Sequence, residues 1–254
     1  MTNSGTQLED RVAIVTGASR GLGRALTVAL ADAGARVTAV ARSEADLADT
    51  AKVADPTGQR VLPVVADLND PSAGEAILAA TIDHFGAVDI LVNNAGVHYP
   101  TPFLDTSAED WNAILDLNLV SVVNLTRTVG RELVRRGSGK VINVTSSWAT
   151  RAMPQHTAYV TAKAALAQFT RALAREWARH GVTVNALAPG YFATEITRAS
   201  MSEPKVLDRM LANIPQRRIG EPDEIGPLAV FLASRAADYV TGATFTIDGG
   251  MELT

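Results

Sequence analysis

The chain has 254 residues, of which 47% are hydrophobic and 20% are charged, and it contains no cysteine. A chain of this length can bury a large apolar core, and α/β chains of this size commonly form one domain. The lack of cysteine excludes disulfide bonds, thiolate metal sites and cysteine nucleophiles, while a formal net charge of −4 with interspersed signs excludes the basic surface that nucleic-acid binding requires.

Metal and membrane partners are not expected either. The four histidines are scattered without the paired spacing of metal ligands, so no metal site is predicted. Residues 1–10 form a polar N-terminal tail without the apolar centre of a signal peptide, and no apolar run is long enough to span a membrane. We therefore expect a soluble cytoplasmic protein with a single domain over residues 11–254.

The first predicted strand, residues 12–16, leads into a glycine-rich loop and a helix that begins near Leu22. Small residues in such a loop allow backbone amides and a helix N-terminus to approach a pyrophosphate. The spacing of Gly17, Gly21 and Gly23 differs from the usual Gly-x-Gly-x-x-Gly dinucleotide fingerprint. Glycines also serve ordinary turns, so this loop by itself leaves both interpretations open.

The second predicted strand, residues 36–41, ends where dinucleotide-binding folds distinguish NADP from NAD. An acidic side chain there holds the ribose 2′-hydroxyl, whereas arginine suits a 2′-phosphate. Arg42 follows this strand, and Arg20 in the glycine-rich loop offers a second guanidinium. This pattern favours NADP; the alternative is that Arg42 opens a solvated helix beside Glu44.

Two further strands are predicted at residues 61–66 and 88–92. Asp67 follows the third strand, and its carboxylate could cap the Ala-rich helix that comes next. The fourth strand leads into Asn93-Asn94-Ala95-Gly96, and a helix is then predicted over residues 111–136.

Residues 141–144 are predicted to form a buried strand, and residues 157–180 one long helix. Ser146 lies just after that strand, and parallel strands present their carboxyl ends to a ligand crevice. Tyr159 and Lys163 are four residues apart and therefore share one face of the helix. The Arg135-Arg136 pair is interpreted as a solvated helix end.

This stretch combines the groups that acid-base chemistry needs. A free tyrosine ionises near pH ~10, so proton exchange at neutral pH requires about 4 kcal/mol of stabilisation of the phenolate, which a cation ~4 Å away can supply. Lys163 is thus a candidate for lowering the pKa of Tyr159, and Tyr159 is a candidate general acid or base. Ser146 is a candidate hydrogen-bond donor to a substrate oxygen. A Tyr-x-x-x-Lys pair alone is weak evidence, because it arises easily by chance.

The remaining predicted elements are a strand at residues 182–188, a helix over 199–213 within a lid segment of about 191–215, a helix over 224–234 and a last strand at 244–247. Strands alternate with helices, without repeats or linkers. This alternation predicts an α/β fold, a Rossmann-type doubly wound parallel sheet of seven strands in the order 3-2-1-4-5-6-7, flanked by helices.

These motifs together resemble the short-chain dehydrogenase/reductase family, in which a catalytic serine lies thirteen residues before the Tyr of Tyr-x-x-x-Lys, as Ser146 does before Tyr159. The resemblance covers nearly the whole chain through residues 16–23, 93–96, Asn118, the catalytic stretch, Pro189-Gly190 and residues 248–250. It implies that Asn118, Ser146, Tyr159 and Lys163 are catalytic, with Asn118 holding a water that links Lys163 to solvent. The family also commonly forms homotetramers.

The resemblance further implies a nicotinamide cofactor, NADP with NAD as the alternative. The residues implied to bind it are Gly17, Ser19, Arg20, Gly21, Leu22, Gly23, Arg42, Asp67, Leu68, Asn94, Ala95, Gly96, Tyr159, Lys163, Pro189, Gly190, Phe192 and Thr194. Asp67 and Leu68 would cradle the adenine and Asn94 the ribose. The backbone near Phe192 and the hydroxyl of Thr194 would meet the carboxamide.

The substrate is the least determined feature. The pocket is expected from His98, Trp148, Arg151, Met153, His156 and Tyr191. Residues 188–197 look similar to gluconate 5-dehydrogenase-like members, whereas the general pattern equally resembles 3-oxoacyl carrier-protein reductases. The bulk of the loop before Tyr159 favours a small polar or ring-bearing ketone, and Arg151 either offers a donor to it or points to solvent.

We therefore expect an NADP(H)-dependent enzyme that transfers hydride between nicotinamide and a ketone or secondary alcohol, with Tyr159 as the acid-base group. The alternatives are an NAD-dependent alcohol or sugar-acid dehydrogenase, a 3-oxoacyl thioester reductase, and a non-catalytic cofactor-binding regulator.

Overall fold

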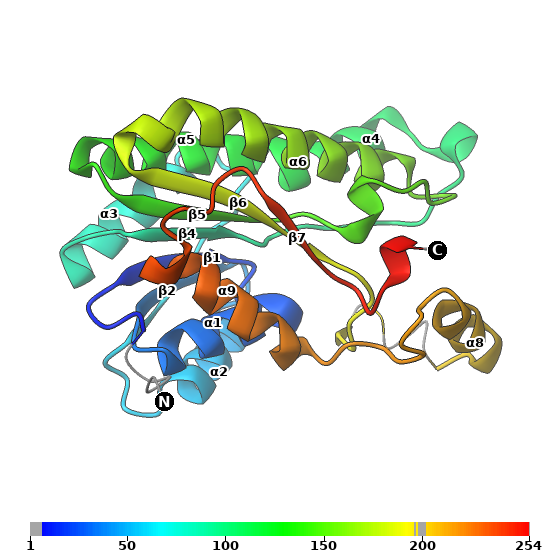
Figure 1. Cartoon of the computed structure of the whole chain (residues 1–254), viewed down its shortest axis with the longest axis horizontal. Helices are drawn as coiled ribbons and strands as arrows, with labels where there is room; N and C mark the ends of the chain where they lie inside the picture. The colour runs from blue at the N-terminus through cyan, green and yellow to red at the C-terminus, as the bar shows by residue number, and fades with distance from the viewer. Residues whose placement is uncertain (1–6, 196, 198–201, 254) are drawn as a thin grey trace.

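One parallel sheet of seven strands organises the molecule. The computed structural model describes residues 7–195, 197 and 202–253. Its strands are β1 (Val12–Thr16), β2 (Arg36–Ala41), β3 (Val61–Val65), β4 (Ile90–Asn93), β5 (Gly139–Val144), β6 (Val182–Pro189) and β7 (Thr244–Ile247). They are ordered β3-β2-β1-β4-β5-β6-β7, which confirms the predicted Rossmann-type architecture (Figure 1).

Helices cover both faces of this sheet. The helices of the described residues are α1 (Gly21–Asp32), α2 (Glu44–Ala54), α3 (Ala73–Phe85), α4 (Ala108–Leu115), α5 (Ser121–Arg136), α6 (Thr157–Trp177), α8 (Pro204–Ala212) and α9 (Gly226–Ala233), of which α8 lies apart from the sheet (Figure 1). Helices α1, α2 and α9 pack on one face, and α3, α5 and α6 on the other (Figure 1). Central strands are therefore buried on both faces, which explains why their sequences are continuous apolar runs.

Several predicted boundaries differ from the structure by a few residues, among them β5, which begins at Gly139, and α6, which ends at Trp177. The single helix predicted over residues 111–136 is two helices, because a π-helical turn at Asp116–Val120 separates α4 from α5. The helix predicted from residue 224 begins at Gly226, since residues Pro222–Ile225 form a 3-10 turn. The fourth strand begins two residues later than predicted, at Ile90.

The predicted lid is described in part. Helix α8 begins with Pro204 at its first turn, a position that suits proline because the missing amide would have no helical partner. Residues 199–201 of the predicted helix, and residues 196 and 198 of the predicted lid, lie outside the described residues.

Buried amides fix the centre of the sheet to the helices above it. Asn93 donates through Nδ2 to Asn143 Oδ1 at 2.8 Å and to Thr126 Oγ1 at 2.9 Å. Asn143 in turn donates to Thr170 Oγ1 on α6 at 2.9 Å. This chain of hydrogen bonds ties β4 and β5 to α5 and α6, and so holds the strand ends that lead to the site.

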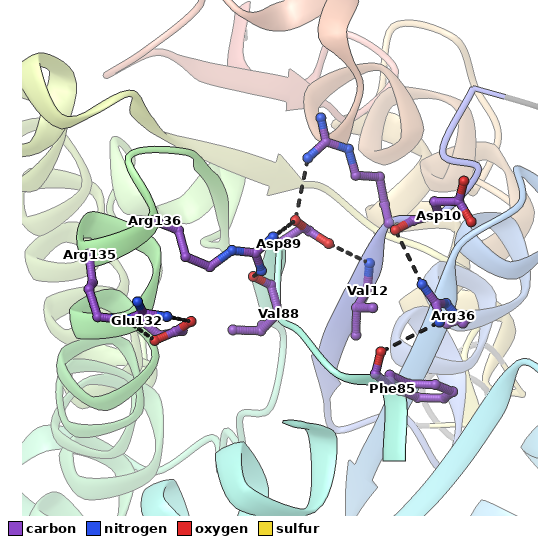
Figure 2. A network of polar contacts seen from close by, with 10 residues as sticks. Asp10, Val12, Arg36, Phe85, Val88, Asp89, Glu132, Arg135 and Arg136 are labelled. Atoms are coloured by element: carbon purple, nitrogen blue, oxygen red, sulfur yellow. Dashed lines mark hydrogen bonds and ion pairs between the residues drawn. The ribbon is translucent and has the colours of Figure 1, made fainter. Parts of the chain in front are cut away.

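An ion-pair network holds the opposite, amino-terminal edge of the sheet (Figure 2). The buried carboxylate of Asp89 accepts from the Val12 amide at 2.9 Å and pairs with Arg11 and Arg136. Arg136 also donates to the carbonyl oxygen of Val88 at 2.7 Å. Arg136 is exposed, as expected of a solvated helix end, but its guanidinium also connects the end of α5 to the residues just before β4. In the described ranges, no helix is long and apolar enough to cross a membrane.

Candidate active site

A cavity of about 450 Å³ opens at the carboxyl ends of the strands, at the reversal of strand order between β1 and β4. In open α/β sheets this is where ligands bind. All residues predicted to bind a cofactor line it except Phe192. The side chain of Phe192 is buried instead, and its ring would lie 3.0 Å from a Cβ built on Gly220.

The glycine-rich loop forms one wall of the cavity by close backbone packing. A Cβ built on Gly23 would lie 2.0 Å from the carbonyl oxygen of Gly17 and 2.6 Å from Asn94 Nδ2, so only glycine fits there. Helix α1 begins at Gly21, and its N-cap residue Arg20 makes no capping hydrogen bond with its side chain. The first amides of α1 therefore remain available to a phosphate.

Thr16 connects this loop to the turn after β4. Its Oγ1 accepts hydrogen bonds from the amides of Asn94 at 3.0 Å and Ala95 at 3.1 Å, and its carbonyl oxygen accepts from Asn94 Nδ2 at 2.9 Å. This role of Thr16 was not predicted. A hydroxyl at the last position of a buried strand, directly before the loop, was the available signal.

Arg20 and Arg42 both line the cavity. Arg42 is accompanied there by Ser43, whose Oγ caps α2 by accepting from the Asp46 amide at 3.4 Å. Arg20 forms an exposed ion pair with Glu195 at 3.6 Å. Asp67 also lines the cavity, and it stabilises its own turn rather than capping α3, because its Oδ1 accepts from the Asn69 amide at 3.0 Å.

Ser146, Tyr159 and Lys163 meet at the inner end of the cavity. Tyr159 and Ser146 are hydrogen-bonded through their side chains, and Ser146 Oγ also accepts from the Trp148 amide at 3.2 Å. The ammonium of Lys163 lies 5.7 Å from the centre of the Tyr159 ring and donates to the carbonyl oxygen of Val144 at 2.9 Å. The predicted spacing along α6 thus does bring phenol and ammonium together.

The electrostatic balance differs from the sequence-based prediction. Burial raises the pKa of Tyr159, and its hydrogen bond with Ser146 offsets this only in part. Burial also lowers the pKa of Lys163 to about 8. Lys163 was predicted to lower the pKa of Tyr159, but desolvation penalises both charged forms and prevails here.

Asn118 occupies the π-helical turn between α4 and α5. Its side chain is fully buried, and Nδ2 donates to the carbonyl oxygens of Ile114 and Val97, each at 2.8 Å. The side-chain amide therefore connects this helical turn to the loop after β4. Such turns inside α-helices frequently mark functional sites.

The other polar atom of this amide faces Lys163. Asn118 Oδ1 is buried without a hydrogen-bond partner in the described protein. A Cβ built on Gly96 would lie 2.5 Å from that oxygen and 3.5 Å from Lys163 Nζ. The acceptor and the ammonium therefore border the same small space beside Gly96, which suits the predicted relay.

Aromatic rings surround Tyr159 at the substrate end. His98, Trp148 and Tyr191 line the cavity. His156 stacks on His98 with 5.5 Å between ring centres and meets Trp148 edge-on at 4.9 Å. Trp148 in turn contacts Tyr191, so the four rings form a continuous wall.

Three residues expected in the pocket, Arg151, Met153 and His156, do not line the cavity. The guanidinium of Arg151 donates to the carbonyl oxygen of Met251, and so anchors the C-terminal turn. The carbonyl oxygen of Met153 accepts from the His156 amide at 3.3 Å, and the His156 ring packs behind His98 and Trp148. None of these three side chains therefore supplies the substrate contact that the sequence suggested.

Comparisons with known proteins agree on one group. A family model described as enoyl-(acyl carrier protein) reductase matches residues 17–252. The 3-oxoacyl-[acyl-carrier-protein] reductase FabG of Vibrio cholerae is 40% identical over 246 residues, covering 97% of this chain and 99% of that protein. The 2-dehydro-3-deoxy-D-gluconate 5-dehydrogenase of Dickeya dadantii is 38% identical over 244 residues, covering 96% of each.

Solved structures that resemble this chain are also dehydrogenases. A gluconate 5-dehydrogenase from Burkholderia cenocepacia, crystallised with NADP and tartrate, superposes with a TM-score of 0.93 at 35% identity, covering 99% of this chain and 98% of that one. A putative short-chain alcohol dehydrogenase from Sinorhizobium meliloti has a TM-score of 0.94 at 40% identity, covering 98% of both chains.

Proposed function

Because the chain belongs to the short-chain dehydrogenase/reductase family, whose members act on CH–OH and C=O groups with NAD(P), we propose that it transfers hydride between NADP(H) and a small ketone or the matching secondary alcohol. The observation that carries this proposal is the convergence of Ser146, Tyr159 and Lys163 at one end of a cavity whose other end is a glycine-rich loop.

The cavity suits a dinucleotide. The loop at Gly17 and Gly23 and the first turn of α1 would hold the pyrophosphate, because backbone amides point there and a side chain would clash. Asn94 and Lys163 would hold the ribose beside the nicotinamide. The cofactor, when bound, supplies or accepts the hydride.

The preference for NADP over NAD rests on Arg42. This residue lines the cavity just after β2, where a 2′-phosphate would gain charge-assisted hydrogen bonds from a guanidinium and a 2′-hydroxyl does not need them. Relatives crystallised with NADP support this choice. NAD remains the alternative cofactor of the proposal.

Side chains of the protein donate the proton and replace it. In reduction, the Tyr159 hydroxyl gives its proton to the substrate oxygen as that oxygen gains negative charge, and Ser146 donates a hydrogen bond to the same atom. The Lys163 ammonium stabilises the phenolate that is left. A water between Asn118 Oδ1 and Lys163 would then return a proton to the site, which accounts for the buried acceptor.

The aromatic wall favours a compact polar or ring-bearing ketone. Trp148 and His98 line the cavity and contact the Tyr159 ring, and they offer both flat apolar faces and ring nitrogens to a substrate. Gluconate dehydrogenases among the similar structures are consistent with such a substrate.

The second candidate is reduction of a 3-oxoacyl thioester. The 40% identity to a reductase that acts on acyl carrier protein favours it, and the same catalytic residues would serve. The two candidates differ only in what the aromatic wall admits.

Assembly as a homotetramer is also proposed, as the family resemblance implies. Phe103, Leu104 and Val120 expose apolar side chains just before and between α4 and α5, and a second copy would cover them. Light scattering at micromolar concentration should show a tetramer, and a monomer would contradict this assignment.

A substrate screen tests the function. The wild-type enzyme should oxidise NADPH with a five- or six-carbon keto acid or a cyclic ketone, and the kcat/KM for these should exceed that for a β-ketoacyl thioester by tenfold or more, about 1.4 kcal/mol of transition-state preference. A tenfold preference for the thioester would instead establish the second candidate. Reactions without a carbonyl compound provide the control.

A further inference from the structure

The loop that carries Ser146 and Trp148 into the cavity is a single short turn. Ser146 caps the 3-10 turn Ser147–Ala149, because its Oγ accepts from the Trp148 amide at 3.2 Å. Thr150 ends this turn. A 3-10 turn has poorer hydrogen-bond geometry than an α-helix. The position of Trp148 therefore depends on contacts that fix the ends of the turn.

The end at Thr150 is held by the C-terminal turn, residues 248–253. Glu252 Oε1 accepts from the hydroxyl of Thr150 at 2.7 Å, and Oε2 accepts from the hydroxyl of Thr246 on β7 at 2.6 Å. Such short distances are typical of hydrogen bonds to an ionised acceptor. The hydrogen bonds from Thr246 and Thr150 also lower the pKa of the Glu252 carboxyl. One exposed carboxylate thus joins the loop to the last strand.

The C-terminal turn is itself fastened beside the cavity. Asp248 accepts from the amide of Gly250 at 2.8 Å and from that of Glu252 at 2.7 Å. Gly190, which lines the cavity, donates through its amide to the carbonyl oxygen of Ile247 at 3.0 Å. A Cβ built on Gly190 would lie 2.6 Å from the Cβ of Asp248, so the two segments are closely packed. Glu252 is therefore held on a firm base.

A second contact joins the loop to the same turn. The guanidinium of Arg151 donates to the carbonyl oxygen of Met251, and the Met251 side chain is buried. Trp148 meets the rings of Tyr159 and Tyr191 edge-on, with ring centres 6.3 Å and 5.6 Å apart. The anchored loop therefore determines how close the indole of Trp148 lies to the phenol that serves the carbonyl.

We propose that Glu252 is a positioning residue for substrate selection, whose hydrogen bond to Thr150 holds the loop so that Trp148 narrows the cavity beside Tyr159. The inference rests on the proposed function and adds to it a residue outside the cavity lining that determines which ketones fit. Without the carboxylate, the Thr150 hydroxyl would keep only its longer bond, of 3.4 Å, to the carbonyl oxygen of Ser147. The indole would then be free to move away from the substrate.

The kinetic test compares cyclohexanone with hexan-2-one, which have the same number of carbon atoms and differ in shape. Wild type with NADPH should prefer cyclohexanone. Glu252→Ala should lower the kcat/KM for cyclohexanone roughly tenfold and reduce this preference, while the NADPH dissociation constant changes by less than about twofold. Thr150→Val should give the same result. Glu252→Gln keeps an accepting oxygen and should retain most of the preference.

Two control variants separate positioning from a general loss of stability. Thr246→Val removes the other hydrogen bond to the same carboxylate and leaves the bond from Thr150, so its preference should remain close to that of wild type. Glu75→Ala, on the exposed first turn of α3, should also behave as wild type. The positioning role is wrong if Glu252→Ala keeps the full preference, or if Thr246→Val loses as much of it as Thr150→Val.

Fluorine NMR keeps the inference independent of turnover. The chain has three tryptophans, so labelling with fluorotryptophan gives three resonances, of which Trp148→Phe identifies one. That resonance should shift or broaden in Glu252→Ala and Thr150→Val, while those of Trp111 and Trp177 stay unchanged. A wild-type protein that reduces neither ketone but shows this change would contradict the proposed function alone. An active enzyme whose Trp148 resonance and ketone preference both ignore these substitutions would contradict the positioning role alone.

Discussion

Lys163 holds its ammonium 5.7 Å from the centre of the Tyr159 ring, one turn further along α6, while donating to the carbonyl oxygen of Val144 at 2.9 Å. Burial lowers the pKa of this lysine to about 8. A cation placed there supports a phenolate but opposes folding, because it has left water for a partly apolar site. Function and stability should therefore respond in opposite directions when the charge is removed.

Lys163→Met should test this opposition. Below pH 8 the lysine is charged in both the folded and unfolded states, and the lowered pKa of the folded state corresponds to a cost of roughly 3 kcal/mol. Removing the charge recovers this, less about 1 kcal/mol for the lost hydrogen bond. The variant should thus be more stable than wild type by about 1–2 kcal/mol at pH 7 in denaturant unfolding, and almost inactive.

The stability difference between wild type and Lys163→Met should also depend on pH, which provides a second test of its sign. As pH rises from about 8 towards the unfolded value of 10.5, folded Lys163 loses its charge first and the cost declines. Wild type should gain stability relative to Lys163→Met over this interval. A variant that is less stable at pH 7, or a difference that does not change with pH, contradicts the electrostatic account.

Arg42→Ala should alter cofactor choice. The loss of a charge-assisted hydrogen bond to the 2′-phosphate should weaken NADPH binding by ~1.5–3 kcal/mol and leave NADH binding nearly unchanged. Fluorescence titration with both cofactors measures the two affinities. Lys52→Ala, an exposed cation on α2, is the matched control. If Arg42→Ala weakens the binding of NADPH and NADH equally, Arg42 does not recognise the 2′-phosphate.

Asn118→Ala should slow turnover without weakening NADPH binding. The variant lacks the acceptor that faces Lys163 and leaves the carbonyl oxygens of Ile114 and Val97 without their donor. We expect kcat to fall by roughly tenfold or more and stability to fall by about 1–3 kcal/mol. Normal kcat in a folded variant is the outcome that excludes the relay.

Gly23→Ala should disrupt the glycine-rich loop. Its Cβ would lie 2.0 Å from the carbonyl oxygen of Gly17, and that backbone cannot move without displacing the loop. We expect more than tenfold weaker NADPH binding and a loss of about 1–3 kcal/mol of stability. Gly74→Ala is the matched control, because the nearest atom there, 3.1 Å away, is the hydroxyl of Thr128, which can rotate.

The sequence predicts the parts of this protein that depend on local pattern. Apolar runs predict most of the strands, and the alternation of strands with helices predicts their order in one parallel sheet, which the structure confirms. The four-residue spacing on α6 likewise placed Tyr159 beside Lys163. Both inferences need only periodicity and the geometry of one element.

Features that depend on long-range contacts could not be predicted in this way. Arg136 seemed to end a solvated helix, but it reaches Asp89, which lies 47 residues earlier in the chain. Arg151 was expected near the substrate, yet it bonds to Met251 at the C-terminal turn. The direction of the Tyr159 pKa shift depends on burial, which no local pattern reports.

Turnover by Tyr159→Phe is the most direct test of the proposed mechanism. The substitution removes the transferable proton and leaves the phosphate loop intact. Wild type should oxidise NADPH with a small ketone, and the variant should bind NADPH with unchanged affinity while losing nearly all turnover. Retention of more than about a tenth of the wild-type kcat by the variant would contradict the assignment of Tyr159 as the acid-base group.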